Sequence, residues 1–274
     1  MHTIETYGRR FLSAARTFRR RLYTMKIEKF RDQHASRPAP LETCIKLQED
    51  ARRVFNDPDC LVRPEQQCPR TGENIRDAQI AEMYRNTEPN PWRLADETMN
   101  WLVDFLYCKR PRVVLEFGSG LSTACLCVTL AKIHGPDGFR LLSVEQDMEE
   151  LGRTLGRLDQ YVGSHSCRVM HAPLMRAVVA ERPTFFYDFI ESSDDFSWMG
   201  KAEFVLIDGP FAPGPCREGT LSQVRPHLQS GADFMMDDAL REKELFAGAL
   251  WARSGIAVEG VLTIGEGIMI GHIP

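Results

Sequence analysis

Three aspartates stand directly after two runs of apolar residues, where buried strands of an α/β protein would end. Asp208 follows residues 204–207 and opens Asp-Gly-Pro, while Asp237 and Asp238 follow residues 232–236 and open Asp-Asp-Ala. Carboxylates that converge at one sheet edge must bind a cation, share protons or meet basic groups, because like charges repel. Oxygen ligands suit Mg²⁺, so the three aspartates form a candidate metal site. One of the adjacent pair could instead cap the following helix.

The same carboxylates and one histidine are candidates for proton transfer. Without a metal, Asp208 could accept a proton directly. Asp238, at the neighbouring strand end, is a second candidate base. His171 follows residues 168–170, where we expect another strand, and is a third candidate base. A histidine at a strand end can equally be a structural residue held by a hydrogen bond.

A glycine turn follows a third apolar run. Residues 113–123 are Val-Val-Leu-Glu-Phe-Gly-Ser-Gly-Leu-Ser-Thr, which predicts a strand, a turn and the start of a helix. Gly118 and Gly120 allow close backbone approach there, and the amides at the helix start favour an anion. A dinucleotide-binding turn would have a third glycine where this chain has Thr123. This difference, together with Glu116 before the first glycine, argues against NAD.

Glu145 ends a fourth apolar run, residues 141–144, and comes 25 residues after Gly120. An acid at the tip of the second strand can accept hydrogen bonds from two ribose hydroxyls. Because many surface acids end strands, Glu145 alone is a weak indication. Together with the glycine turn it predicts a ligand that contains a nucleoside.

These residues require a sheet that brings strand ends together. Short apolar runs alternate with helical segments, which predicts a parallel sheet covered on both faces. We expect helices at 41–55, 74–84, 95–107, 122–133, 148–158, 174–180, 219–228 and 242–252. Residues 257–264 and 268–273 flank Gly-Glu-Gly, which predicts a C-terminal antiparallel hairpin. The fold class is therefore α/β and Rossmann-like.

The motifs E-F-G-S-G, V-E-Q-D, H-A-P-L, F-F-Y-D, L-I-D-G-P and D-D-A-L-R occur in this order. The order resembles that of class I S-adenosylmethionine-dependent methyltransferases, within them the group with D-G-P on strand four and D-D-A on strand five. The resemblance covers residues 94–274 and implies a seven-stranded, mostly parallel sheet. It also implies S-adenosyl-L-methionine as the cofactor and, by likeness to catechol-type enzymes, a metal. Those enzymes have an asparagine as third metal ligand, where this chain has Asp238.

The resemblance also implies a role for each part of the cofactor site. The methionine part would be surrounded by Glu116, Gly118 and Gly120, with Ser122 and Thr123 near its carboxylate. Glu145 would hold the ribose, and the segment from Ala172 to Leu174 would lie by the adenine. The sequence thus predicts a methyltransferase, most simply one that methylates a hydroxyl of a small molecule. The alternatives are an N-methyltransferase and a non-catalytic nucleoside-binding or assembly protein.

Charge is distributed unevenly along the chain. Residues 1–37 carry ten basic and three acidic side chains, for a net charge of +7, and the rest carries −11, which together give −4. An acidic body is a poor nucleic-acid binder, so we expect no nucleic-acid partner. We divide the chain into a basic amphipathic arm (1–37), a helical cap (38–93) and the methyltransferase domain (94–274).

The arm has apolar residues at helical spacing, and such a helix could serve oligomerisation, a membrane surface or organelle targeting, or simply pack on the domain. The stripe comprises Ile4, Tyr7, Phe11, Ala14, Phe18, Leu22 and Met25. The longest uncharged run has 15 residues, too few for a membrane span of about 20. Eight cysteines without paired spacing favour free thiols and a cytoplasmic location.

Overall fold

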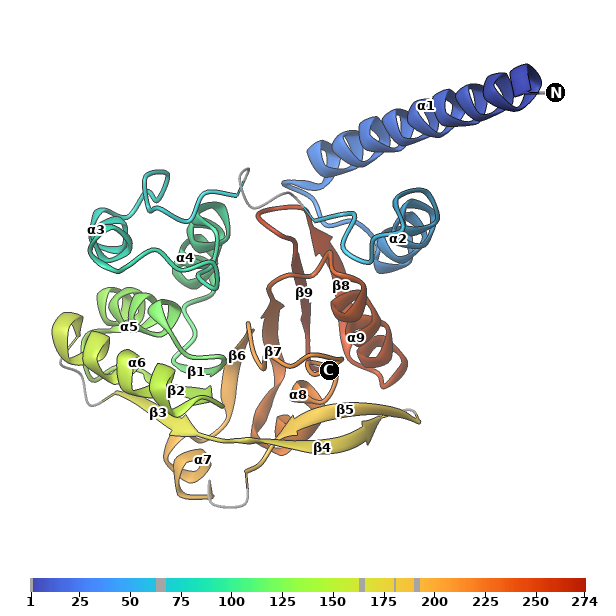
Figure 1. Ribbon diagram of the computed structural model, residues 1–274. Coiled ribbons are helices and arrows are strands. Elements are labelled where there is room, and N and C mark those ends of the chain that lie inside the picture. The colour runs from blue at the N-terminus through green and yellow to red at the C-terminus, as the bar shows by residue number, and fades with distance from the viewer. Residues whose placement is uncertain (1, 63–67, 163–165, 180, 190–192) are drawn as a thin grey trace.

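The computed structural model describes residues 2–62, 68–162, 166–179, 181–189 and 193–274, with side chains from residue 16 onward except at residue 18. A seven-stranded sheet lies at the centre of this structure in the order β3-β2-β1-β6-β7-β9-β8 (Figure 1). The strands are β1 (Val113–Phe117), β2 (Arg140–Glu145), β3 (Cys167–His171), β6 (Ala202–Ile207), β7 (Leu228–Met236), β8 (Ala257–Leu262) and β9 (Ile268–His272). The first five are parallel, and β9 is antiparallel to β7 and β8. The predicted fold class is confirmed.

Helices cover both faces of the sheet because alternate strand residues point to opposite sides. Val114 packs in the cluster that includes α3 (Ala78–Asn86), α4 (Asp96–Lys109), α5 (Leu121–His134) and α6 (Met148–Tyr161). Leu115, the next residue, belongs to the opposite cluster. That cluster includes α2 (Leu41–Phe55), α7 (Ser193–Met199), α8 (Thr220–Val224) and α9 (Glu242–Arg253).

The register of the parallel strands explains why residues far apart in the sequence meet at one edge. Phe117, the last residue of β1, pairs with Val144 on β2 and with Ile207 on β6, and Ile207 pairs with Met236 on β7. The residues that follow these four therefore emerge side by side. They are Gly118, Glu145, Asp208 and Asp237.

One predicted helix is a strand, and another ends earlier than expected. Residues 174–180 were expected to be helical, but β4 (Leu174–Val179) pairs with β5 (Arg182–Tyr187) in a separate antiparallel sheet. The β-branched Val178 and Val179 favour the extended form, and β5 supplies the hydrogen bonds. The helix expected at 219–228 ends as α8 at Val224 and continues as a 3-10 turn, Arg225–His227, in which Pro226 offers no amide hydrogen.

The start of α3 is set by a cap rather than by apolar spacing. We expected this helix from residue 74, but it begins at Ala78. The Asp77 carboxylate accepts hydrogen bonds from the amides of Gln79 and Ile80, which satisfies two of the free donors at the helix start.

The basic arm forms one long helix, α1 (His2–His34), which extends away from the sheet (Figure 1). Leu22 and Met25 of the predicted stripe are exposed, and the other five stripe residues lie outside the described side chains. Burial instead falls on Ile27 and Phe30 near the end of α1. In the described residues, no helix is both long and apolar enough to cross a membrane.

The C-terminal end of α1 is hydrogen-bonded to the segment between β8 and β9. The buried Arg31 side chain donates hydrogen bonds to the carbonyls of Leu61 (2.7 Å), Thr263 (3.1 Å) and Gly265 (2.6 Å). Beyond it, Ala39 is fully buried and forms an antiparallel bridge with Val261 on β8. Ala39, between the two prolines that follow α1, therefore pairs with the edge strand of the sheet.

Candidate active site

A cavity of about 610 Å³ opens at the carboxyl edge of the parallel strands. Its floor comes from the turns after β1, β2, β6 and β7, which carry the residues singled out in the sequence. One wall consists of residues 87–94 from the N-terminal region, and another of side chains from α6. Ligand cavities in proteins commonly have volumes of 300–1,000 Å³, so a cofactor-sized molecule fits this space.

Gly118 occupies a place that no other residue could take without displacing the neighbouring strand end. Its φ angle is +86°, and a Cβ atom would lie 2.8 Å from the amide nitrogen of Gly209. Gly209 is equally confined, because its own Cβ would lie 2.6 Å from the Tyr187 hydroxyl. The turns after β1 and β6 are therefore in direct backbone contact beneath the cavity.

Glu116 joins the end of β1 to the start of α5 by hydrogen bonds. It is fully buried, and its carboxylate accepts hydrogen bonds from the hydroxyls of Ser122 (2.7 Å), Thr123 (2.6 Å) and Ser143 (2.7 Å). Burial raises the pKa of Glu116 to about 7, although the three hydroxyls act in the opposite direction. Glu116 and Thr123 do not line the cavity, whereas Ser122 does.

Glu145 lines the cavity at the end of β2. Its Oε2 atom accepts hydrogen bonds from the amide (2.9 Å) and hydroxyl (2.8 Å) of Ser119, and its Oε1 atom accepts one from the amide of Asp147 (2.9 Å). Burial raises the pKa of Glu145, against these hydrogen bonds. The carboxylate is thus fixed in orientation, and each oxygen retains lone-pair capacity for a ligand hydroxyl.

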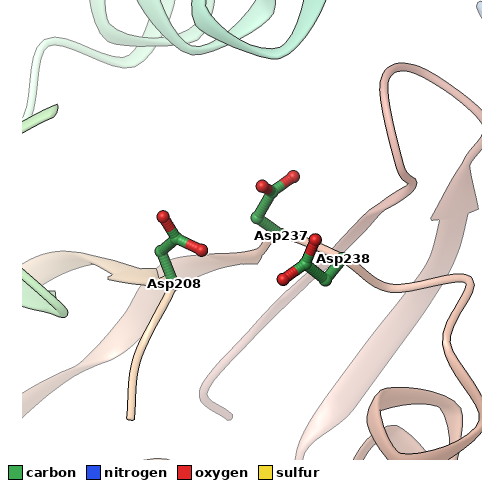
Figure 2. Close-up of side chains that lie close together, drawn as sticks. All are labelled: Asp208, Asp237 and Asp238. Atoms are coloured by element: carbon green, nitrogen blue, oxygen red, sulfur yellow. The ribbon is translucent and has the colours of Figure 1, made fainter. Parts of the chain in front are cut away.

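The three aspartates meet at the ends of β6 and β7, beside the glycine turn. One carboxylate oxygen from each of Asp208, Asp237 and Asp238 lies within 4.8 Å of the others. Figure 2 shows Asp208 at one strand end and the adjacent pair at the next, with the carboxylates of Asp208 and Asp238 directed toward each other. The predicted convergence of these side chains is confirmed.

Two arginines contact these carboxylates. The Arg217 Nη2 atom lies 3.1 Å from Asp238 Oδ2 and 3.4 Å from Asp208 Oδ1, and Arg241 Nη1 lies 2.7 Å from the same Asp238 oxygen. Arg241 also donates to Glu266, which in turn pairs with Arg70. The aspartates therefore meet basic groups that belong to the protein itself.

The arginines and burial together shift the pKa values of the three aspartates in different directions. Burial would raise the pKa of Asp238, but Arg217 and Arg241 outweigh it and hold this pKa below its usual range. Burial raises the pKa of Asp208 to about 6, with Arg217 acting in the opposite direction. The pKa of Asp237 is raised well above its usual range by burial and by the charges of Asp238 and Asp208. Its Oδ1 atom has no hydrogen-bond partner within the described part of the chain.

This donor set does not fit a Mg²⁺ ion. Magnesium requires near-ideal octahedral oxygen ligands. Here Asp238 Oδ2 already accepts from two guanidinium groups, and a third contact joins Arg217 to Asp208. A divalent cation among these oxygens would also lie beside two fixed positive charges.

Three other predicted site residues lie outside the cavity lining. His171 is exposed on β3, and its Nε2 atom is hydrogen-bonded to the carbonyl of Gln146 (3.1 Å), which corresponds to the structural alternative. Ala172 is fully buried and Leu174 begins β4, and neither borders the cavity. We therefore assign no proton transfer to His171.

Phe211 and Gln146 also line the cavity, and the sequence did not indicate them. Phe211 forms an aromatic pair with Trp92, with ring centroids 4.8 Å apart, and both residues are more than half exposed. Gln146 joins the turns after β2 and β6, because its side chain donates to the Phe211 carbonyl (2.8 Å) and accepts from the Phe211 amide (2.9 Å). Such contacts join loops distant in sequence, so neither spacing nor periodicity indicates them.

No protein-family model matches the chain, and no curated protein sequence matches it. Among solved structures, a methyltransferase of Podospora anserina with bound S-adenosylhomocysteine is 11% identical, with 83% of this chain and 96% of that chain covered at a TM-score of 0.49. The O-methyltransferase TomG of Streptomyces achromogenes, in complex with S-adenosylmethionine, is 14% identical over 86% and 99% of the chains at a TM-score of 0.47. An O-methyltransferase of Bacillus cereus with S-adenosylhomocysteine is 12% identical over 85% and 100% at 0.44. No residue role or substrate is transferred from proteins this distant.

Proposed function

We propose that this protein is an S-adenosylmethionine-dependent methyltransferase that methylates a hydroxyl group of a small molecule. One observation carries the proposal: a single cavity is lined by a glycine turn, by a fixed acid, Glu145, and by Asp208 and Asp237. The glycine turn and Glu145 suit a nucleoside with an anionic tail, and the two aspartates suit a group that loses a proton.

The chain's own residues would hold the cofactor by hydrogen bonds and by close backbone approach. Glu145 would accept hydrogen bonds from the ribose hydroxyls, and Gly118 and Gly120 would leave room for the methionine part. Ser122 and the amides at the start of α5 would face its carboxylate. When bound, the cofactor supplies a sulfonium-activated methyl group to an oxygen nucleophile.

Asp208 would take the acceptor's proton. Its side chain is 19% exposed, it borders the cavity, and Arg217 holds its carboxylate in position. Asp237 borders the same space with an unpartnered oxygen and would orient the acceptor by a hydrogen bond. Orientation of the acceptor and removal of its proton are the two contributions that methyl transfer needs from the protein.

The charge of the cavity favours a hydroxyl over an amine. Seven basic and seven acidic side chains line it, so their formal charges cancel. An amine would enter as an ammonium ion and would be attracted by a net negative cavity, which this one is not.

The proposal is tested by supplying S-adenosylmethionine with separate panels of phenols, aliphatic alcohols and amines, and by measuring S-adenosylhomocysteine release. We expect turnover with hydroxyl compounds, and we expect Asp208→Asn to lower it by about 10²- to 10⁴-fold while S-adenosylhomocysteine still binds. Full turnover in Asp208→Asn would remove the role given to this residue. Turnover with amines alone would identify an N-methyltransferase, and binding without turnover a nucleoside-binding protein.

A further inference from the structure

The guanidinium group of Arg217 contacts two carboxylates of the acidic cluster, those of Asp208 and Asp238. Besides its contacts with the Asp208 and Asp238 carboxylates, Nη2 donates to the main-chain carbonyl of Asp208 (2.5 Å), and Nη1 donates to that of Asp237 (2.8 Å). One side chain thus joins the ends of β6 and β7 by main-chain and side-chain contacts. A cation that bridges the carboxylates of Asp208 and Asp238 would compete with Nη2 for the same two oxygens.

The backbone that carries Arg217 is also fixed. The carbonyl of Arg217 accepts hydrogen bonds from the amide (3.2 Å) and hydroxyl (2.8 Å) of Thr220. The next residue, Glu218, accepts through its carbonyl from the Trp251 indole (2.8 Å) and through its side chain from Thr184 (3.1 Å). Only 8% of the Arg217 side chain is exposed, so the guanidinium cannot move into solvent without breaking these contacts.

We propose that Arg217 is the resident cation of this site, occupying the position that a divalent metal ion would take among Asp208, Asp237 and Asp238. Arg241 completes the arrangement by its contact with Asp238. The site therefore works without Mg²⁺ or Mn²⁺. This inference refines the function proposed above, but its test measures metal binding and does not depend on methyl transfer.

An arginine suits this position because its charge is permanent. A guanidinium presents five donors in a rigid plane and keeps its proton throughout the physiological range. It balances the charge of buried carboxylates without exchanging with solvent ions. Removal of Arg217 would leave carboxylates uncompensated, and such a group of oxygens binds a hard divalent cation.

The experiment is titration of the full chain with Mn²⁺, followed by electron paramagnetic resonance of the free ion, on the wild type and on Arg217→Ala. Arg225→Ala is the matched control, because Arg225 is exposed on the 3-10 turn that follows α8. We expect no saturable Mn²⁺ binding by the wild type or by the control. Arg217→Ala should gain one Mn²⁺ site, and adding Asp237→Asn to Arg217→Ala should remove it. A folded Arg217→Ala protein that binds no Mn²⁺ would overturn the proposal.

If Arg217→Ala does not fold, the wild type and Asp237→Asn decide the question. Saturable Mn²⁺ binding by the wild type that Asp237→Asn abolishes would overturn the proposal, and absence of such binding supports it. S-adenosylhomocysteine affinity of the wild type, measured on the same samples in EDTA, separates the two proposals. If the wild type does not bind S-adenosylhomocysteine, the methyltransferase function is contradicted. The result on metal binding does not depend on that outcome.

Discussion

Ser119 holds Glu145 by two hydrogen bonds to the same carboxylate oxygen, one from its amide at 2.9 Å and one from its hydroxyl at 2.8 Å. The turn after β1 thereby fixes the acid at the end of β2. The carboxylate does not have to be ordered when a ligand arrives, so its contribution to binding is not reduced by lost side-chain entropy.

Glu145→Ala should weaken S-adenosylhomocysteine binding while the fold remains intact. Loss of a carboxylate that accepts from two ribose hydroxyls should cost about 2 kcal/mol, or about 30-fold in dissociation constant. Calorimetric titration measures the change. Glu149→Ala is the control, since Glu149 is 81% exposed and does not line the cavity. Equal affinity in Glu145→Ala and the wild type would remove the ribose assignment.

Glu116→Gln should gain stability over the wild type as the pH rises. The pKa of Glu116 is raised from 4.5 to about 7 on folding, so the stability that its protonated form contributes is complete below pH 4.5 and is lost as pH rises through 7. Glutamine does not titrate. The difference in unfolding free energy should therefore shift in favour of the variant by about 3 kcal/mol between pH 4.5 and 8.

Urea unfolding of both proteins across this pH range measures that difference. Glu149→Gln serves as the reference, because Glu149 is exposed and its replacement should leave the pH dependence unchanged. If the difference in unfolding free energy between Glu116→Gln and the wild type does not change with pH, the pKa of Glu116 is not raised on folding.

Gly118→Ala should lower stability and weaken S-adenosylhomocysteine binding together. An alanine at φ +86° costs about 1–2 kcal/mol, and its Cβ would also press on the backbone of Gly209. Gly156→Ala on α6 has open space at its Cβ and should instead stabilise by about 0.5–1 kcal/mol. Thermal unfolding of the two variants compares them directly. Similar shifts of the same sign would contradict the close contact of the two turns.

Arg31→Ala should destabilise the protein by about 3 kcal/mol, because three buried carbonyls lose a charged donor. Arg20→Ala, on the exposed part of α1, should leave the unfolding free energy unchanged. Denaturant titration distinguishes these outcomes. If the two variants are equally stable, the end of the arm is not part of the fold.

Much of the scaffold could be predicted from local sequence. Mostly apolar runs bounded by glycine and acidic residues give the positions of the seven main strands along the chain, and parallel pairing then places Gly118, Glu145, Asp208 and Asp237 at one edge. The segment 174–179 was assigned to the wrong class because a short apolar run fits a helix or a strand, and its partner β5 decides between them.

The charge balance of the site could not be predicted in this way. Arg217 lies in an irregular segment between β6 and α8, where no periodicity indicates a direction, and its partners lie 9 and 21 residues away. The sequence does not distinguish Arg31 from the other arginines of the arm, because its three carbonyl partners lie far from it along the chain. Long side chains with distant partners are placed by tertiary structure alone.

Calorimetric titration of the full chain with S-adenosylhomocysteine, first with Mg²⁺ and then with EDTA, tests the central claim most directly. The structure predicts one site per chain with the same dissociation constant in both buffers. Absence of binding in both would contradict the assignment of the cavity to S-adenosylmethionine and of the protein to the methyltransferases.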